Sequence, residues 1–263
     1  MQRIFFLGTG AALPSITQDN SSLLVESNDV LLMIDCSGSP YRKLLRIGAD
    51  PLKLKHILIT HHHIDHISGL PSLIECLWIK GRTEPLHIYA LPAAMQVIEV
   101  LLDLWDLRSR PIKEFPIVLH TIAGVEDELV FESPEFTLRT TPTLHAVPSV
   151  ATRLTFPDGQ ILVYSSDTAP TPAFLVFAQG ADYLMMECTF CDDEQELAGI
   201  TYHLTSATFS EIAQNVQAGH TLLVHHSEQM SCSHADLARE IVEKHGFKGK
   251  FSIPRDLDFI VIK

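Results

Sequence analysis

Hydrophobic and polar positions divide the chain into short strand-like runs and longer helix-like runs. The strand-like runs are rich in β-branched and aromatic residues and are bounded by Gly, Pro, Asp or Asn. They fall at residues 3–8, 21–25, 30–35, 56–60, 86–91, 117–122, 128–131, 136–143, 151–156, 161–165, 183–187, 221–225 and 259–262. The predicted helices fall at residues 41–47, 69–79, 93–107, 171–177, 206–218 and 233–244. Strands interleaved with helices predict a layered α/β fold with helices covering the outer sheet faces.

Two helix starts and two helix stops can be predicted from single residues. Ser206 and Ser233 are expected N-caps, and Gly219 and Gly246 are expected stops. Turn residues recur from end to end, with no linker-like change of composition, and the 263 residues are 46% hydrophobic. We therefore expect one domain over residues 1–263.

No signal peptide and no membrane span are expected, because the first apolar stretch is short and no window holds the roughly 18 to 20 apolar residues that a span needs. The five cysteines are odd in number and unevenly spread, which favours a reducing compartment. The expected location is cytoplasmic. The Cys188–Cys191 CxxC stands alone, so it is interpreted as incidental.

The net charge of −13 argues against a long nucleic acid as partner, because phosphate neutralisation requires Lys and Arg. The best basic cluster is interpreted as a solvated face: Arg42, Lys43, Arg46, Lys53 and Lys55. A small phosphate substrate is compatible with an acidic chain, since bound cations dominate the local field at a site.

Polar side chains follow several predicted strands, and one group has the character of a metal site. The segment Thr60-His61-His62-His63-Ile64-Asp65-His66 joins a strand to the start of a helix. In an extended segment the side chains of His61 and His63 point to the same side, because side chains alternate along a strand. The following turn points the side chains of Asp65 and His66 in another direction. One ion does not comfortably take four ligands from so short a stretch. Two neighbouring ions do, so a dinuclear site is predicted.

The motif Thr-His-x-His-x-Asp-His after a strand resembles the signature of the metallo-β-lactamase superfamily. Nearly the whole chain resembles its ribonuclease Z and small-molecule phosphodiesterase branch. The segments Phe6-Leu7-Gly8-Thr9-Gly10-Ala11 and Ile34-Asp35-Cys36 match two landmarks, although Ser37 replaces a usual Gly. The resemblance implies a four-layer αββα sandwich in a single domain.

The resemblance also implies the remaining metal ligands. His145 would complete the first ion with His61 and His63, Asp167 would bridge the ions, and His225 would complete the second ion with Asp65 and His66. His226 competes with His225 for the last position. Mixed His and Asp ligands suit Zn²⁺, with Mn²⁺ or Fe²⁺ as further candidates.

Two such ions activate water near neutral pH, polarise the attacked centre and neutralise phosphoryl charge. The expected reaction is therefore attack of metal-bound hydroxide on a phosphodiester, with Asp65 as ligand and orienter. His203, in Tyr202-His203-Leu204-Thr205, resembles the general acid of the ribonuclease Z branch. Glu187 matches the glutamate that assists it, although Met186 stands where the family often has His. A carboxylate neighbour raises the pKa of a histidine, as an acid requires.

Two departures from ribonuclease Z favour a small or short phosphodiester as substrate. Residues 14–20 lack the Lys and Arg of the family's basic loop, and only 21 residues separate His145 from Asp167, too few for a tRNA-binding arm. The alternatives are ribonuclease Z acting as a homodimer, a hydrolase of sulfate ester, lactone or thioester bonds, and a metal-binding sensor with little activity.

Overall fold

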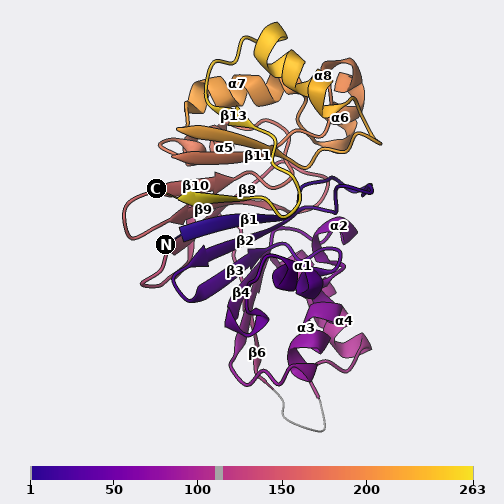
Figure 1. The fold of residues 1–263 in the computed structure, drawn as a ribbon, viewed down its shortest axis with the longest axis vertical. Coiled ribbons are helices and arrows are strands. Elements are labelled where there is room, and N and C mark those ends of the chain that lie inside the picture. The colour runs from indigo at the N-terminus through magenta and orange to yellow at the C-terminus, as the bar shows by residue number, and fades with distance from the viewer. Residues whose placement is uncertain (1, 110–114, 263) are drawn as a thin grey trace. The chain divides into compact units, whose positions relative to one another are not determined.

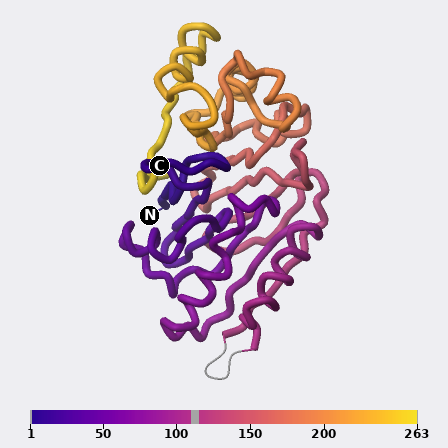
Figure 2. Tube along the Cα trace, turned by 90° about the vertical axis from the view of Figure 1, so that its right-hand side faces the viewer, coloured from indigo at the N-terminus to yellow at the C-terminus, as the bar shows by residue number. Residues whose placement is uncertain are grey.

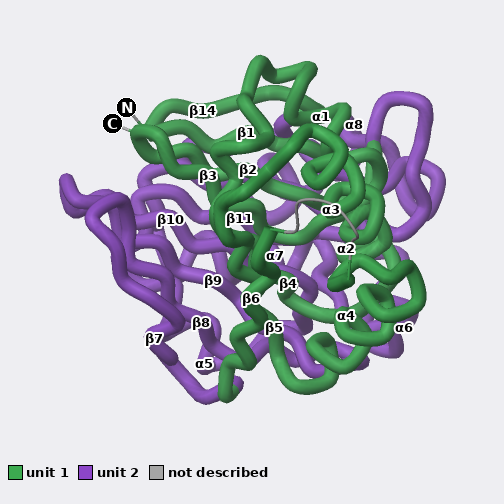
Figure 3. The backbone as a smooth tube through the Cα atoms, turned by 90° about the horizontal axis from the view of Figure 1, so that it is seen from below, with its two compact units in different colours: residues 1–8, 19–123, 255–263 green, residues 9–18, 124–254 purple. Residues whose placement is uncertain are grey.

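A computed structural model describes residues 2–109 and 115–262. Contacts group the chain into two compact units, coloured separately in Figure 3. Unit 1 comprises residues 1–8, 19–123 and 255–263, and unit 2 comprises residues 9–18 and 124–254. A single domain over residues 1–263 stays a prediction.

Unit 1 is built on a mixed sheet of seven described strands in the order β14-β1-β2-β3-β4-β5-β6. The strands are β1 (Gln2–Gly8), β2 (Ser22–Ser27), β3 (Val30–Ile34), β4 (Leu54–Ile59), β5 (Leu86–Ala90), β6 (Ile117–Thr121) and β14 (Phe259–Ile262). Pairing is antiparallel from β14 to β3 and parallel from β3 to β6. Because β14 pairs with β1, the two ends of the chain lie together (Figure 2).

The helices of unit 1 pack on one face of this sheet. They are α1 (Pro40–Arg46), η1 (Pro51–Lys53), α2 (Ile64–Ile67), α3 (Leu70–Ile79) and α4 (Pro92–Leu104). Leu73 of α3 and Ile98 of α4 are fully buried in one cluster with Ile57 and Ile59 of β4 and Ile88 of β5. The alternation of each strand therefore places its aliphatic residues against the helices.

Unit 2 has a second mixed sheet of seven described strands in the order β13-β12-β11-β10-β9-β8-β7. The strands are β7 (Glu128–Glu132), β8 (Thr137–Pro142), β9 (Val150–Thr155), β10 (Ile161–Tyr164), β11 (Tyr183–Glu187), β12 (His220–Val224) and β13 (Phe251–Ser252). Pairing is antiparallel from β7 to β10 and parallel from β10 to β13.

Helices also cover this second sheet (Figure 1). They are α5 (Pro172–Ala178), η2 (Asp192–Glu194), α6 (Gln195–Thr201), α7 (Ser206–Val216), α8 (His234–Arg239) and the π-helical η3 (Glu240–Lys244). Phe174 of α5, Phe209 of α7 and Leu237 of α8 are buried in one cluster with Leu184 of β11 and Leu223 of β12.

The predicted α/β class is confirmed, with two mixed sheets and helices. One predicted cap is wrong: Thr205 is the N-cap of α7, because its side chain accepts from the backbone N–H of Thr208, while Ser206 is the first helical residue. Helix α7 ends earlier than Gly219, with Gln217 in a left-handed conformation. Ser233 does cap α8, and Gly246, at φ 66°, follows η3. None of the described helices is long and apolar enough to span a bilayer.

Candidate metal centre

In each unit the candidate site residues follow neighbouring parallel strands. Asp35 follows β3 and His61 lies just beyond the end of β4, while Asp167, Glu187 and His225 lie at or after the ends of β10, β11 and β12. Parallel strands present their carboxyl ends at one edge of a sheet, where side chains converge. Asp35 and His225 have left-handed backbones, at φ 60° and 56°, a costly conformation for these residues that is often found at functional sites.

The first ligand cluster comprises His61, His63, Asp65 and His66 of unit 1. His61 Nε2 lies 3.2 Å from His63 Nδ1, and His66 Nε2 lies 3.4 Å from Asp65 Oδ2. Helix α2 begins directly after His63 and carries the second pair of donors. Two ligands on one tetrahedral zinc, at bonds of about 2.0–2.1 Å, lie about 3.3–3.4 Å apart. The donor chemistry and the spacing of both pairs therefore fit a divalent metal.

Asp35 contacts His66 of this cluster directly, and the Thr60 hydroxyl that donates to Asp35 lies 3.1 Å from His61 Nδ1. The Nδ1–H of His66 donates to Asp35 Oδ2 at 2.8 Å, and Thr60 donates its backbone N–H and its hydroxyl to Asp35 Oδ1 at 2.8 and 3.0 Å. Burial raises the pKa of the Asp35 carboxyl, although the neighbouring His66 opposes that shift. The hydrogen bond fixes the His66 proton on Nδ1, so the Nε2 lone pair faces Asp65. The sequence marked Asp35 only as a landmark, and its role at His66 was missed.

The second ligand cluster comprises His145, Asp167 and His225 of unit 2. Asp167 Oδ2 lies 3.3 Å from His225 Nε2 and 3.8 Å from His145 Nε2, and the three side chains are at most 3% exposed. Burial lowers the pKa of His145, against the opposing charge of Asp167. One carboxylate oxygen thus lies between two imidazole nitrogens, which also suits a metal.

The neighbouring His226 makes different contacts. Its Nδ1 lies 3.1 Å from the carbonyl oxygens of Cys188 and Thr189, and its Nε2 lies 2.9 Å from that of Cys232. Carbonyl oxygens only accept hydrogen bonds, so one ring nitrogen of neutral His226 donates its N–H to them, and both nitrogens face carbonyl oxygens of this unit. Within unit 2 it is therefore His225 that lies beside Asp167.

Glu187 and His203 form a buried pair next to the second ligand cluster. The Nδ1–H of His203 donates to Glu187 Oε1 at 2.8 Å, and the backbone N–H of Thr168 donates to the same oxygen at 2.8 Å. Glu187 is fully buried, whereas the side chain of His203 is 13% exposed. The His203 ring lies 5.0 Å from that of His145 and 5.4 Å from that of His225, between centroids.

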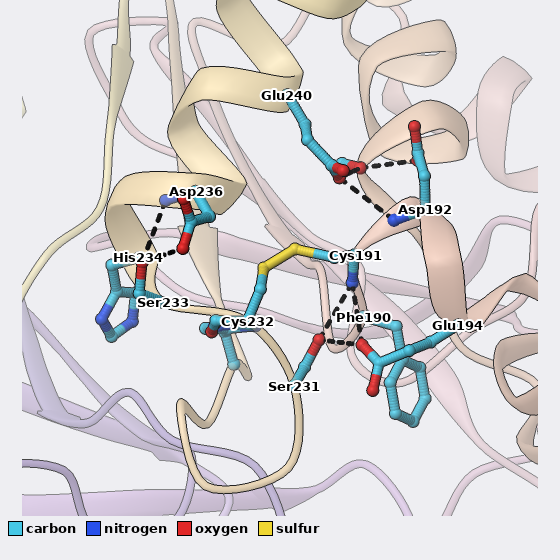
Figure 4. Close-up of a disulfide and its surroundings, with 12 residues drawn as sticks. Phe190, Cys191, Asp192, Glu194, Ser231, Cys232, Ser233, His234, Asp236 and Glu240 are labelled. Carbon is cyan, nitrogen blue, oxygen red and sulfur yellow. Dashed lines mark hydrogen bonds between the residues drawn. A yellow bond between two sulfur atoms is a disulfide. The ribbon is translucent and has the colours of Figure 1, made fainter.

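A disulfide between Cys191 and Cys232 ties the segment after β11 to the segment after β12 (Figure 4). The backbone N–H of Cys191 also donates to Ser231 Oγ at 3.0 Å. Cys191 therefore pairs outside the CxxC, and Cys188 is a free, buried thiol. The odd number and uneven spread of the five cysteines favoured reduced thiols, so the sequence did not predict this pair.

Comparisons with known proteins show the class of protein to which the chain belongs. Ribonuclease Z of Myxococcus xanthus (strain DK1622) is 28% identical over 288 residues, covering 92% of each chain. The metallo-β-lactamase fold protein YhfI from Bacillus subtilis superposes with a TM-score of 0.79 at 24% identity, covering 98% of each chain. A diphosphatase from the PhnP family superposes with a TM-score of 0.75 at 19% identity, covering 99% of this chain and 97% of its own. The chain is a metal-dependent hydrolase with the metallo-β-lactamase fold.

The family follows from a family-model match. The model described as anti-Pycsar protein Apyc1 matches residues 2–247, and the chain belongs to that family.

Proposed function

We propose that this hydrolase is a phosphodiesterase for small or short phosphodiesters. The observation that carries the proposal is the buried Glu187–His203 pair beside the second ligand cluster. A histidine held by a carboxylate can donate a proton to a poor leaving group, such as an alkoxide, which needs a proton in order to leave.

We further propose that the chain binds two divalent ions, with Zn²⁺ as the first candidate. The proposed ligands are His61, His63, Asp65, His66, His145, Asp167 and His225. This set rests on the resemblance of the motifs and on the donor spacing within each ligand cluster. When bound, such ions activate water and neutralise charge on the phosphoryl group. Asp65 would bind an ion and also orient the attacking water.

The proton for the leaving oxygen would come from His203. Because His203 Nδ1–H is held by Glu187, the transferable proton of the imidazolium is on Nε2. The buried Glu187 carboxylate stabilises the imidazolium through this hydrogen bond and keeps the ring in place during transfer. A p-nitrophenyl ester, whose leaving group is a stabilised phenolate, would need this proton less.

The structure around residues 146–166 supports a small substrate. These residues are all described, and they form β9, a turn and the antiparallel partner strand β10. Residues 14–20 carry no Lys or Arg, and the net charge is −13. A tRNA contacted by few cations would bind weakly at physiological salt.

The second candidate function is ribonuclease Z activity. The observation in its favour is the similarity, over 92% of the chain, to the ribonuclease Z of Myxococcus xanthus. Tight tRNA binding with a steep salt dependence, or cleavage at the tRNA 3′ end, would favour it over the first proposal.

A substrate panel on metal-analysed protein tests the proposal. It would contain bis(p-nitrophenyl) phosphate, cyclic nucleotides, precursor tRNA, a sulfate ester and a lactone. We expect about two ions per chain and turnover of phosphodiesters that stops on chelation and returns on reloading. Asp167→Ala is the negative control. A protein that cleaves only the sulfate ester, the lactone or tRNA, or that binds at most one ion, contradicts the proposal.

A further inference from the structure

One hydroxyl group lies between Glu187 and His225. The Oγ1 of Thr189 lies 2.9 Å from Glu187 Oε2 and 3.0 Å from His225 Nδ1. Thr189 is 1% exposed, so water does not compete for these contacts. It follows β11 directly after Cys188.

The direction of these hydrogen bonds follows from the chemistry of the groups. Glu187 Oε2 and the backbone carbonyl of His225, which lies 3.1 Å from Thr189 Oγ1, both only accept. The charged and closer carboxylate is the stronger acceptor of the single hydroxyl proton, and in either case the hydroxyl oxygen accepts from His225 Nδ1–H. With its proton on Nδ1, His225 presents the Nε2 lone pair on the side where Asp167 Oδ2 lies at 3.3 Å. Thr189 thereby selects the tautomer of His225 that can bind a metal.

The same carboxylate holds the candidate acid. Glu187 Oε1 accepts from His203 Nδ1–H, while Oε2 accepts from Thr189. Thr189 Oγ1 also lies 3.3 Å from His203 Nδ1. The four residues His203, Glu187, Thr189 and His225 thus form one connected set of hydrogen bonds.

We propose that Thr189 is a positioning residue through which the Glu187 carboxylate orients the metal ligand His225 as well as the acid His203. This inference rests on the proposed function, because it takes His225 as a ligand and His203 as the acid.

Thr189→Val removes the hydroxyl and keeps the shape of the side chain, and Thr189→Ser keeps the hydroxyl. We expect Thr189→Val to weaken binding of the more weakly held Zn²⁺ by about 10–100-fold, the range found when orienting partners of ligands are lost. Thr189→Ser should keep most of the wild-type affinity for zinc. The matched control is Thr221→Val in β12, a buried threonine whose hydroxyl makes no hydrogen bond among the described residues. Zinc affinity is measured by competition with a chromogenic chelator.

A double-mutant cycle tests whether Thr189 acts on zinc binding through Glu187 or independently of it. Glu187→Gln alone should weaken zinc binding, and adding Thr189→Val to it should add little, because both act through one chain of hydrogen bonds. Fully additive losses would overturn the assignment, and so would a Thr189→Val protein that binds zinc as wild type does.

Imidazole ¹⁵N NMR of zinc-loaded wild-type protein tests the same idea without relying on a folded variant. We expect His225 to carry its proton on Nδ1, and a proton on Nε2 would overturn the inference. Wild-type protein that binds no zinc and cleaves no diester would overturn the proposed function together with this inference. Normal wild-type behaviour with an unchanged Thr189→Val protein would overturn only the role of Thr189.

Discussion

In each ligand cluster a buried carboxylate and a threonine hydroxyl orient two histidines, but the proposed roles of these histidines differ between the clusters. In unit 1 the carboxylate of Asp35 accepts directly from His66 Nδ1 at 2.8 Å and from Thr60, whose hydroxyl oxygen also lies 3.1 Å from His61 Nδ1. In unit 2 the carboxylate of Glu187 accepts directly from His203 Nδ1 at 2.8 Å and is linked to His225 through the hydroxyl of Thr189. Asp35 therefore acts on two proposed metal ligands, whereas Glu187 acts on one proposed ligand and on the candidate acid.

This difference separates metal binding from proton transfer. A carboxylate that orients only proposed metal ligands should affect metal affinity and the turnover of every substrate alike. A carboxylate that also holds the acid should in addition affect substrates with a poor leaving group. The segments around the second ligand cluster are in addition joined by the Cys191–Cys232 disulfide. The cysteines of unit 1, Cys36 and Cys76, are free.

Removing the disulfide should have the largest effect on stability. The bridge closes a loop of 41 residues, and we expect Cys191→Ser/Cys232→Ser to lose about 2–4 kcal/mol of unfolding free energy relative to the oxidised protein. Denaturant unfolding with and without reductant measures the loss, and Cys76→Ser is the control. Equal stability of the oxidised and reduced proteins would show that the bridge does not stabilise unit 2.

Asp35→Asn should weaken zinc binding by about 10–100-fold, or about 1.4–2.7 kcal/mol, because His66 loses its orienting carboxylate. At limiting metal the rates on good and poor leaving groups should fall by the same factor. The matched control is Asp29→Asn, since the Asp29 side chain is 86% exposed. A defect confined to the poor leaving group would contradict the dedicated role of Asp35.

Glu187→Gln should have a smaller effect on zinc affinity, because it acts on His225 through Thr189. The rate on a diester with a poor leaving group should fall more than the rate on a p-nitrophenyl diester. The basic limb of the pH–rate profile should move to lower pH, because the imidazolium of His203 loses its anionic partner. Glu211→Gln, on the exposed side of α7, is the control. An unchanged pH–rate profile would show that Glu187 does not assist the proton transfer.

A separate prediction concerns acid stability in unit 1. Burial, with the neighbouring His87, lowers the pKa of His56 to about 4. The unfolded chain, with a histidine pKa of about 6.5, therefore takes up the proton first. Stability from this group is present above pH 6.5 and is lost as the pH falls toward 4. In metal-free protein, His56→Gln should make the free energy of unfolding depend less on pH between about 4 and 6.5. The same dependence on pH in the variant and in wild type would contradict the assignment.

The sequence predicted most strands, because β-branched runs between turn residues mark them clearly. It did not predict β13, α2 and α6, which span only Phe251–Ser252, Ile64–Ile67 and Gln195–Thr201. Elements this short carry too few residues for a periodic pattern.

The motif also singled out the pair of His203 and Glu187, which lie together at 2.8 Å. The contacts of Asp35 and Thr189 depend on hydrogen bonds between residues distant along the chain, which no local pattern encodes. The identity of the metal, the number of subunits and the cellular compartment stay predictions.

The most direct test of the account compares His203→Ala with wild type on two diesters. With a poor leaving group we expect the rate to fall by roughly 10²–10⁴-fold, and with p-nitrophenolate far less, because that group leaves without a proton. Zinc content should stay at two per chain. The donor atoms of Glu187, His203 and His225 also lie within 4.8 Å of one another, so a role of His203 in metal binding is the specific alternative. Equal losses on both diesters, or loss of zinc, would contradict the assignment of His203 as the general acid.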